Sequence, residues 1–574
     1  MSAPLSPAAS TSSIASLSDQ TSATSADLPP SPTKKELQLP DEEKTKRAMA
    51  LKDEGNKLFL SGEYDSAKQK YGEGIALDPT IVVLWSNRAA CELKLEQHGL
   101  AIEDASQAIK LDAKFAKAYY RRASAYLSIL DHKSALPDLR KVVQLEPRNP
   151  TVRQQLDDTI KLARRIEFEK AIATTEGPKA WETVATHLFE GTGGTIIDSK
   201  YDGPRLEDGD DEQQAGDQKD VLRKGKHLGK ISEDFINQMI DWFRKGKKLP
   251  LRYCWQIVLG ARRQFEKEPT MVEYTVKKGT NATVYGDIHG QLFDFLHAFD
   301  LSGRPSETNM LLFNGDFVDR GNWGCECLLI LLAYKWLKPE FTFLNRGNHE
   351  TSSMNQTYGF AAEVKAKFGG DLTFKLFTDL FVSLPLATMI TASEDPVKTE
   401  ELPYNAPLAQ RSPIVNENGK KQYFVVHGGL PQEDGVTLDK IQALDRFKIG
   451  QPSEGIAQDL LWADPQAANG RAASKRGVGK GFGPDIAKQW CQLNKVTAIL
   501  RSHEVRNDGY QEEHDGLTVT IFSASNYVDQ VGNKGAFARI NAQGTIEYIQ
   551  FEAQPHPDMR PMHYVSGAMG GMLQ

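Results

Sequence analysis

The chain has 574 residues, of which 40% are hydrophobic and 25% charged, with a formal net charge of −7 at pH 7. This composition is typical of globular proteins, and the acidic balance excludes a general nucleic-acid binder, which needs a basic surface. The five scattered cysteines argue against a disulfide framework, and no apolar stretch reaches the length of a membrane span.

The N-terminal region is of low complexity. Residues 1–45 are rich in Ser, Ala, Thr and Pro and hold few large apolar side chains. Such a segment cannot bury enough surface to offset the entropy lost on ordering, so we expect a disordered tail. It also lacks the early basic residues of a secretory or transit signal. We therefore expect a cytoplasmic protein that also reaches the nucleus, without stable membrane insertion.

A 34-residue period follows the tail. Ala67, Ala101 and Ala135 occupy equivalent positions, and aliphatic residues repeat in the same register. Small residues where two helices touch are typical of helix–turn–helix units stacked as a solenoid. The pattern resembles the tetratricopeptide repeat. We expect three repeats and a capping helix over residues 46–170.

Five polar residues fall at matching repeat positions. Lys52 and Asn56 are one helical turn apart in the first repeat, Lys117 and Arg121 in the third, and Asn87 occupies the position of Arg121 in the second. Solvation of an ordinary helix face explains one such residue, but five together favour a carboxylate-binding groove. They resemble the carboxylate clamp of co-chaperone repeats. The resemblance implies the C-terminal Glu-Glu-Val-Asp tails of heat-shock proteins 90 and 70 as partners.

The repeats are followed by weaker patterns and then by an α/β region. Residues 171–229 include an acidic stretch, Leu206 to Asp220, which predicts a solvated linker. Amphipathic helices and apolar β-type runs then alternate, which predicts sheets covered by helices over residues 230–555. Residues 556–574 form a C-terminal tail.

Five short blocks in the α/β region carry residues that commonly bind metals, and most follow a β-type run. Their candidate ligands are Asp287, His289, Asp316, Asn348, His427 and His503. Each alone is more often a turn or structural residue, but together at strand ends they can converge on one edge of a sheet.

The first three candidates suit one metal ion, and Asp316, Asn348, His427 and His503 suit a second, so that Asp316 bridges both. Mixed oxygen and imidazole ligands favour iron, zinc or manganese over calcium. Two such ions would activate a shared water as a nucleophile at neutral pH.

The blocks GDIHGQ, GDFVDRG, RGNHET, HGGL, LLWADP, RSHE and SNY resemble the phosphoprotein phosphatase family of serine/threonine phosphatases, in family order. The resemblance covers roughly residues 230–555. It implies two mixed β-sheets packed together with helices outside, and hydrolysis of phosphoserine and phosphothreonine in phosphoprotein clients. It also implies two divalent metal ions, Mn²⁺ in vitro and iron, zinc or manganese in the cell. The expected fold is therefore multidomain: an all-α solenoid followed by an α/β metallophosphatase domain.

The resemblance also implies roles for residues beyond the metal ligands. His349 would protonate the leaving oxygen, and Asp319 would orient His349. The phosphate would be bound by Arg320, Arg476 and Asn348, with Tyr527 near the substrate. The sequence departs from the family pattern at Ser525, Val528 and Ala463, none of which is a candidate ligand.

Regulation is a further implication of the resemblance. Glu96 lies in the second repeat where related enzymes make an inhibitory contact, so we expect a monomer that is autoinhibited by its repeats and its C-terminal tail. A non-catalytic chaperone adaptor with a phosphatase fold is the main alternative. A dinuclear phosphodiesterase is disfavoured by the acidic balance and by the implied phosphate-binding set.

Overall fold

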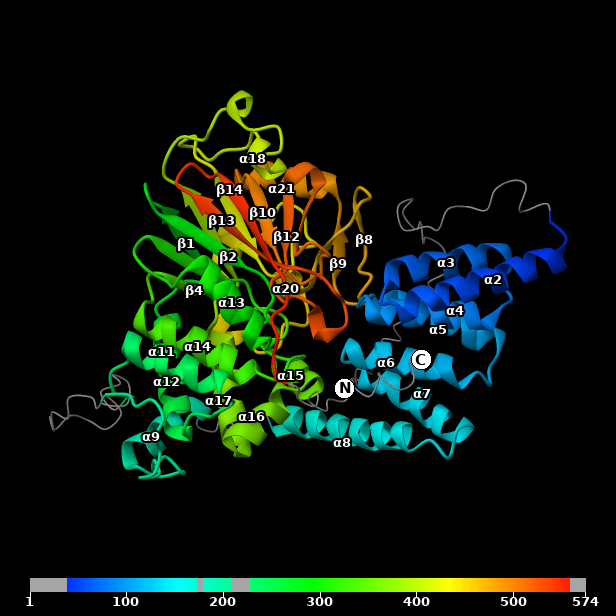
Figure 1. The fold of residues 1–574 in the computed structure, drawn as a ribbon, viewed down its shortest axis with the longest axis horizontal. Helices are drawn as coiled ribbons and strands as arrows, with labels where there is room; N and C mark the ends of the chain where they lie inside the picture. The colour runs from blue at the N-terminus through cyan, green and yellow to red at the C-terminus, as the bar shows by residue number, and fades with distance from the viewer. Residues whose placement is uncertain (1–38, 173–178, 208–227, 558–574) are drawn as a thin grey trace, which may run out of the picture.

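The structure is a computed structural model that describes residues 39–172, 179–207 and 228–557 (Figure 1). Most of the two predicted tails, residues 1–38 of 1–45 and 558–574 of 556–574, lies outside these ranges. Within them, no helix combines the length and the apolar character that crossing a membrane requires.

The first described domain is a helical solenoid. Its helices are α2 (Asp41–Leu60), α3 (Tyr64–Leu77), α4 (Val82–Lys94), α5 (His98–Leu111), α6 (Ala116–Ser128), α7 (His132–Leu145) and α8 (Pro150–Ile172). The repeated alanines at 67, 101 and 135 are fully buried between paired helices, as the period predicts. The solenoid begins earlier than expected, because acidic residues at the start of α2 favour a helix N-terminus. Residues 41–45 are therefore helical and are not part of a disordered tail.

The prediction that residues 171–229 form a linker needs correction at residues 179–207, whereas residues 173–178 and 208–227, with most of the acidic stretch, lie outside the described residues. Helix α9 (Ala180–Glu190) packs against the α/β domain, and its backbone N–H at Trp181 donates to Asp379 Oδ2 at 3.2 Å. Val184, Leu188 and Leu206 are buried in the core of that domain. Val184 and Leu188 lie four residues apart on α9, the spacing of one helix face, which is the signal that predicts this helix.

The α/β domain is built on two mixed sheets packed face to face. One has the order β1-β5-β6-β10-β12-β11 and the other β14-β13-β2-β3-β4. The strands are β1 (Met271–Val276), β2 (Asn281–Tyr285), β3 (Asn309–Phe313), β4 (Thr342–Leu344), β5 (Ala387–Ala392), β6 (Gln422–Val426), β10 (Ala498–Arg501), β11 (Tyr510–Glu513), β12 (Thr518–Ile521), β13 (Gly535–Asn541) and β14 (Ile546–Phe551). Apolar side chains from both sheets fill the space between them, among them Val284, Leu312, Val425 and Leu500. The predicted sandwich is confirmed.

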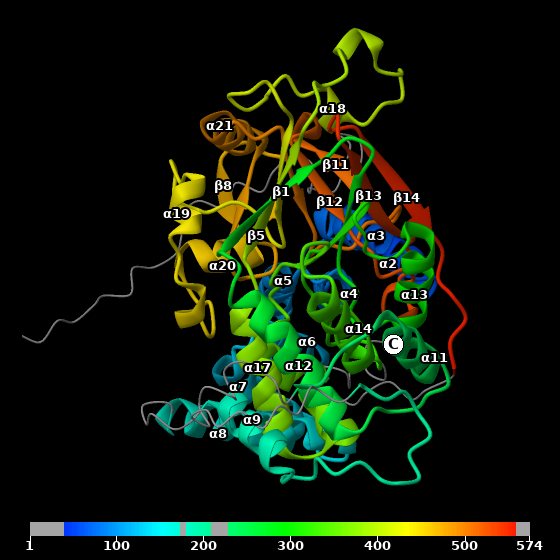
Figure 2. The same ribbon diagram turned by 90° about the vertical axis from the view of Figure 1, so that its left-hand side faces the viewer.

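Helices cover the outer faces of the sandwich (Figure 2). Against the five-stranded sheet pack α11 (Glu233–Arg244), α12 (Leu251–Phe265), α13 (Leu292–Ser302), α14 (Gly324–Leu337), α16 (Phe360–Phe368) and α17 (Gly370–Ser383). Against the six-stranded sheet pack α19 (Leu438–Gln442), α20 (Gly455–Trp462) and α21 (Pro484–Asn494). A small sheet of β7 (Asp464–Pro465), β9 (Lys480–Phe482) and β8 (Arg471–Ala473) lies beside them.

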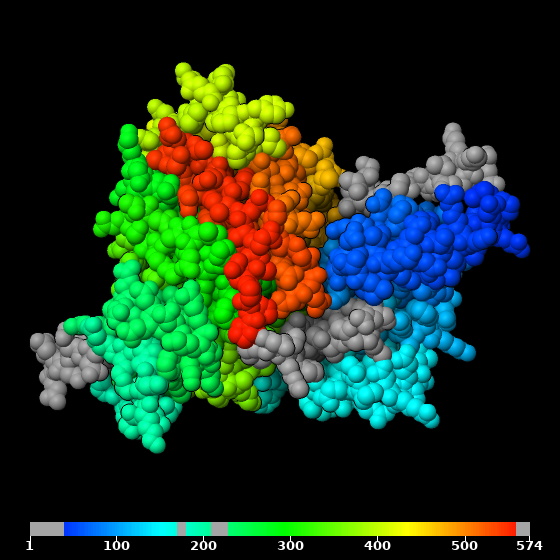
Figure 3. Space-filling model, viewed as in Figure 1, coloured from blue at the N-terminus to red at the C-terminus, as the bar shows by residue number. Residues whose placement is uncertain are grey.

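The candidate ligands lie just beyond the carboxyl ends of β2, β3, β4, β6 and β10. Within each sheet these strands run parallel to one another, so their ends share one edge of the sandwich. The solenoid packs against this side of the α/β domain (Figures 1 and 3).

Candidate active site

The turns that carry the ligands use strained backbone. His289, Asp316 and His503 have φ values of 46°, 52° and 74°, in the left-handed region that side-chain-bearing residues seldom adopt. Such strain is concentrated at functional sites and persists where the surrounding structure enforces it. A Cβ at Gly347 would lie 2.3 Å from Asp316 Oδ1, so only glycine fits between these two turns.

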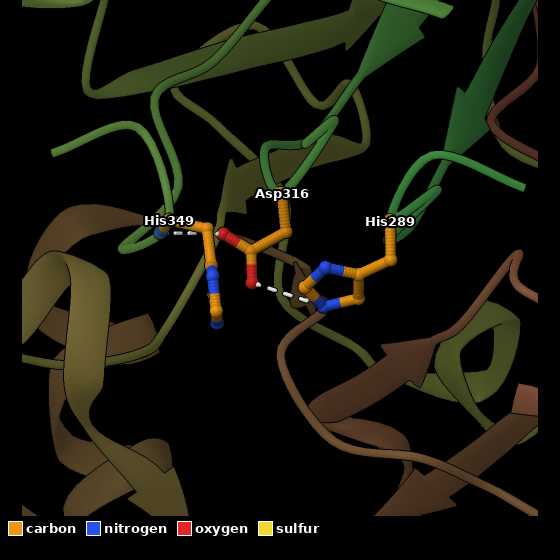
Figure 4. Close-up of side chains that lie close together, drawn as sticks. All are labelled: His289, Asp316 and His349. Carbon is orange, nitrogen blue, oxygen red and sulfur yellow. Dashed lines mark hydrogen bonds and ion pairs between the residues drawn. The ribbon is translucent and has the colours of Figure 1, made fainter. Parts of the chain in front are cut away.

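One group of ligand atoms surrounds His289 (Figure 4). Its Nε2 lies 3.5 Å from Asp316 Oδ2 and 3.7 Å from Asp287 Oδ2. Its Nδ1 lies 3.0 Å from the carbonyl oxygen of Val318. Donation to that carbonyl keeps the proton on Nδ1 and leaves the Nε2 lone pair facing the carboxylates, as in metal-binding histidines. His349 lies in the same cluster.

A second group of ligand atoms meets at Asn348. One end of its side-chain amide lies 2.8 Å from His427 Nε2, 3.1 Å from His503 Nδ1 and 3.1 Å from Asp316 Oδ2. His427 Nδ1 lies 2.8 Å from the carbonyl oxygen of Asn314, which leaves the Nε2 lone pair pointing inward. When the amide oxygen occupies that end, it and the three neighbouring atoms all point lone pairs at one place. A bound cation would coordinate all four.

The electrostatics of the site also suit cations. Burial and the Asp316 carboxylate raise the pKa of Asp287 to about 7. Burial alone would lower the pKa of His427, but Asp316 outweighs it and the pKa rises to about 9. Two buried carboxylates this close repel each other unless positive charge lies between them. The six predicted ligands are therefore brought together in an arrangement that fits two divalent ions.

His349 and Asp319 form a buried pair. His349 Nδ1 lies 2.8 Å from Asp319 Oδ2. Burial alone would lower the pKa of His349, but the carboxylates of Asp316 and Asp319 outweigh burial and raise it. Within the described ranges Nε2 has no hydrogen-bond partner, so it can take part in a proton transfer.

The two predicted phosphate-binding arginines meet at a carboxylate of the solenoid. Arg320 Nη2 donates to Glu96 Oε1 at 2.7 Å, and Arg476 Nη1 donates to Glu96 Oε2 at 3.1 Å. The Tyr527 hydroxyl lies 3.4 Å from Glu96 Oε1. Burial alone would raise the pKa of Glu96, but both guanidiniums outweigh it and hold the pKa well below its usual range. These four residues line one pocket together with Asp287, His289, Asp316, Asn348, His349 and His503.

Three turns of the solenoid face the α/β domain. Gly62, Glu96 and Leu130 are 34 residues apart and have φ values of 85°, 58° and 63°. We call these three residues the turn ridge. A Cβ at Gly62 would lie 3.6 Å from the carbonyl oxygen of Gln530, and Glu96 binds the arginines.

Leu130, the last residue of the turn ridge, packs against an apolar cluster formed by Met354, Tyr358, Leu461 and Trp462. The adjoining carbonyl oxygen of Ser128 accepts a hydrogen bond from the Tyr358 hydroxyl at 2.8 Å. Leu130 was not among the residues predicted from the sequence, although its spacing of one repeat from Glu96 is a signal for it.

The predicted carboxylate groove is partly assembled by direct hydrogen bonds. Asn87 Nδ2 donates to Asn56 Oδ1 at 3.0 Å, and Arg121 donates to Asn87 Oδ1 at 3.2 Å. Lys117 lies one turn before Arg121 on α6. Lys52 forms an ion pair with Asp53 at 3.0 Å. The structure thus links three of the five residues directly.

Comparisons with known proteins agree with both domains. Residues 280–507 match the calcineurin-like phosphoesterase family, residues 116–149 match the tetratricopeptide repeat, and residues 156–273 match the PPP5 TPR repeat region. Serine/threonine-protein phosphatase T of Aspergillus oryzae is 43% identical over 92% of this chain and 98% of its own length. Serine/threonine-protein phosphatase 5 of Homo sapiens is 38% identical over 91% and 93%.

A solved structure from Saccharomyces cerevisiae gives the same picture for the α/β domain. It is described as a protein serine/threonine phosphatase with similarity to human phosphatase PP5. It is 40% identical, with a TM-score of 0.51, and covers 58% of this chain and 100% of its own.

Proposed function

This chain belongs to the family of serine/threonine-protein phosphatases 5 and T, and from that premise we propose that it hydrolyses phosphoserine and phosphothreonine by direct attack of water. Two divalent ions held by the six ligands would supply an activated water and polarise the phosphoryl group. Manganese is the ion for the assay in vitro, and iron, zinc or manganese suit the same donors in the cell.

In this mechanism the side chains bind the phosphate and deliver a proton. Arg320, Arg476 and Asn348 hold the phosphoryl oxygens, since guanidinium groups donate two parallel hydrogen bonds to such anions. His349, held by Asp319, gives its Nε2 proton to the leaving oxygen. No side chain is required as a nucleophile, so we propose that no phosphoenzyme forms.

The observation that carries this proposal is the contact of both arginines with one carboxylate. Glu96 is an anion bound by two guanidiniums beside the metal-ligand cluster. A phosphoryl group placed there would meet the same donors and the same ligands. The intact acid pair and ligand set favour an enzyme over the alternative of a non-catalytic adaptor.

The test is hydrolysis of a phosphoserine peptide by the full chain and by its His349→Ala variant, with and without Mn²⁺. We expect activity that depends on the metal and falls about 100-fold or more in the variant, the usual scale of general acid catalysis. Equal turnover by the variant would refute the assigned acid. Complete inactivity of the wild-type chain under all conditions would favour the adaptor.

We also propose that the repeats bind the C-terminal tails of heat-shock proteins 90 and 70. Arg121 is buried, and burial lowers its pKa to about 10. Among the described residues, its hydrogen bonds go to the neutral groups Ser86 Oγ and Asn87 Oδ1. A buried cation beside neutral partners is stabilised by an incoming carboxylate, and the end of such a tail supplies one.

The contact of Glu96 with the arginines further supports autoinhibition. With Glu96 docked, the site that would bind the phosphate is occupied, so we propose that the solenoid must move away before a phosphoprotein can enter. The C-terminal tail would contribute to the same block. Binding of a chaperone tail would favour the open state. We propose that the protein acts as a monomer in the cytoplasm and also in the nucleus.

A further inference from the structure

Asn355 lies behind the His349–Asp319 pair, on α15 (Ser352–Tyr358), and is fully buried. Its Nδ2 donates to Asp319 Oδ2 at 2.9 Å and to the carbonyl oxygen of His349 at 2.7 Å. The same carboxylate oxygen lies 2.8 Å from His349 Nδ1. The side-chain amide of Asn355 therefore connects the Asp319 carboxylate to the backbone of His349, and the same carboxylate orients the His349 ring.

The other oxygen of Asp319 is also held. It accepts a hydrogen bond from the backbone N–H of Phe360 at 2.9 Å. Hydrogen bonds on both oxygens fix the orientation of the carboxylate relative to the His349 ring. In this orientation the carboxylate faces His349 Nδ1, so the opposite ring nitrogen, Nε2, points away from Asp319. The second ring proton, on Nε2, is the one that can be given to the leaving oxygen.

The orientation of the Asn355 side chain leaves one of its polar atoms without a hydrogen bond. Its Oδ1 is buried and has no hydrogen-bond partner among the described residues. A buried polar atom without a partner destabilises the fold, because its hydration is lost and not replaced. An asparagine present only for packing would gain from an apolar replacement of the same size. The donor end, which bridges Asp319 and His349, therefore accounts for the choice of residue.

We propose that Asn355 is a positioning residue for proton transfer from His349 to the leaving oxygen, an inference that rests on the proposed hydrolysis. In that step the bond between phosphorus and the seryl oxygen breaks. The seryl oxygen keeps the electron pair and takes the Nε2 proton. The oxygen of the attacking water forms the new bond to phosphorus, and a proton released by that water restores His349.

The test compares esters that differ in their need for an acid. p-Nitrophenolate leaves readily without a proton, whereas phenolate and the alkoxide of serine need one. In the full chain with Mn²⁺, we expect Asn355→Leu to lower kcat about 10–100-fold on phenyl phosphate and a phosphoserine peptide, the scale of lost support to a site residue. The kcat on p-nitrophenyl phosphate should change by less than about 3-fold, and KM should stay within about 2-fold, since the phosphate contacts are intact.

Two comparisons separate positioning from general destabilisation. Thr357→Val removes the bond from Thr357 Oγ1 to the carbonyl oxygen of Ser353 on the same helix, at 2.9 Å, and should affect all esters equally. In a His349→Ala background, Asn355→Leu should have little further effect, because residues that act as a unit are not additive. If Asn355→Leu does not fold, Asn355→Ser, which is too short to bridge both acceptors, should show the same split between esters.

An equal loss on all three esters, or full additivity with His349→Ala, would overturn the inference and leave the proposed hydrolysis standing. Failure of the wild-type chain to hydrolyse any ester would overturn the proposed function and the inference with it.

Discussion

At the residue scale, the proposed autoinhibition depends on a few charges at the boundary between domains. His98 follows Glu96 by two positions and faces the same pocket. Burial and the guanidiniums of Arg320 and Arg476 lower the pKa of His98 to about 3, although Glu96 opposes them. Undocking would return His98 to water and its pKa to about 6.5.

This difference predicts that docking depends on pH. Docking favours neutral His98, because the pKa of His98 is lower in the docked state than in the undocked state. Above the undocked pKa, His98 is already neutral and docking has its full strength. Below that pKa, docking must first remove a proton and therefore weakens as the pH falls. Between pH 6.5 and pH 3, docking should weaken by about 1.4 kcal/mol per pH unit. We expect basal turnover of the wild type, divided by that of full-length His98→Gln, to rise up to about 10-fold from pH 7.5 to pH 5.5. A flat ratio would show that His98 does not titrate with docking.

At the element scale, the turn ridge joins the solenoid to the α/β domain through equivalent turns of successive repeats. Glu96 supplies the polar contact, and Leu130 supplies the apolar one. The 34-residue period places both on one edge of the solenoid, because identical repeats present identical turns to the same side.

The turn ridge predicts a second route to activation. Leu130→Ser should weaken docking by about 1–3 kcal/mol through loss of apolar burial and raise basal turnover of p-nitrophenyl phosphate about 5–150-fold. Leu111→Ser is the matched control, since this side chain is partly exposed on α5 and should leave turnover unchanged. Unchanged turnover in Leu130→Ser would show that Glu96 alone holds the docked state.

At the scale of the whole molecule, the α/β domain begins before the sequence pattern suggests. Val184, Leu188 and Leu206 pack into its core, and each buried aliphatic side chain contributes about 1.5–3 kcal/mol. Their sum approaches the net stability of about 5–15 kcal/mol that is usual for a domain. We therefore expect residues 179–574 to fold and residues 228–574 to unfold or aggregate, as measured by thermal unfolding. Equal melting temperatures would place α9 outside the domain.

The groove and the active site are joined by one helix. Asn87 lies on α4, and Glu96 follows the C-terminal end of that helix. We expect a Glu-Glu-Val-Asp peptide to bind the full chain and raise basal turnover, since a ligand held at one end of α4 can shift the position of the turn at its other end. Arg121→Ala should lower peptide affinity about 10-fold or more without changing basal turnover. Activation that survives this substitution would assign the peptide to another site.

Much of this organisation could be read from local patterns. The alanine period predicts three repeats. The metal-binding residue types that follow β-type runs predict the six ligands that the structure gathers at one edge of the sandwich. The set was predictable because parallel strands end on the same side. The roles of Asn355 and Leu130 could not be predicted from local patterns. Asn355 contacts residues that lie on another turn, and Leu130 contacts residues in the other domain.

The sequence by itself determined the residue chemistry, the repeat period and the order of the domains, since these depend on spacing along the chain. Only the tertiary structure decided that Glu96 lies between Arg320 and Arg476, more than 200 residues away, and that α9 belongs to the α/β core. Contacts between distant segments depend on the surfaces that packing brings together, and spacing along the chain does not encode those surfaces.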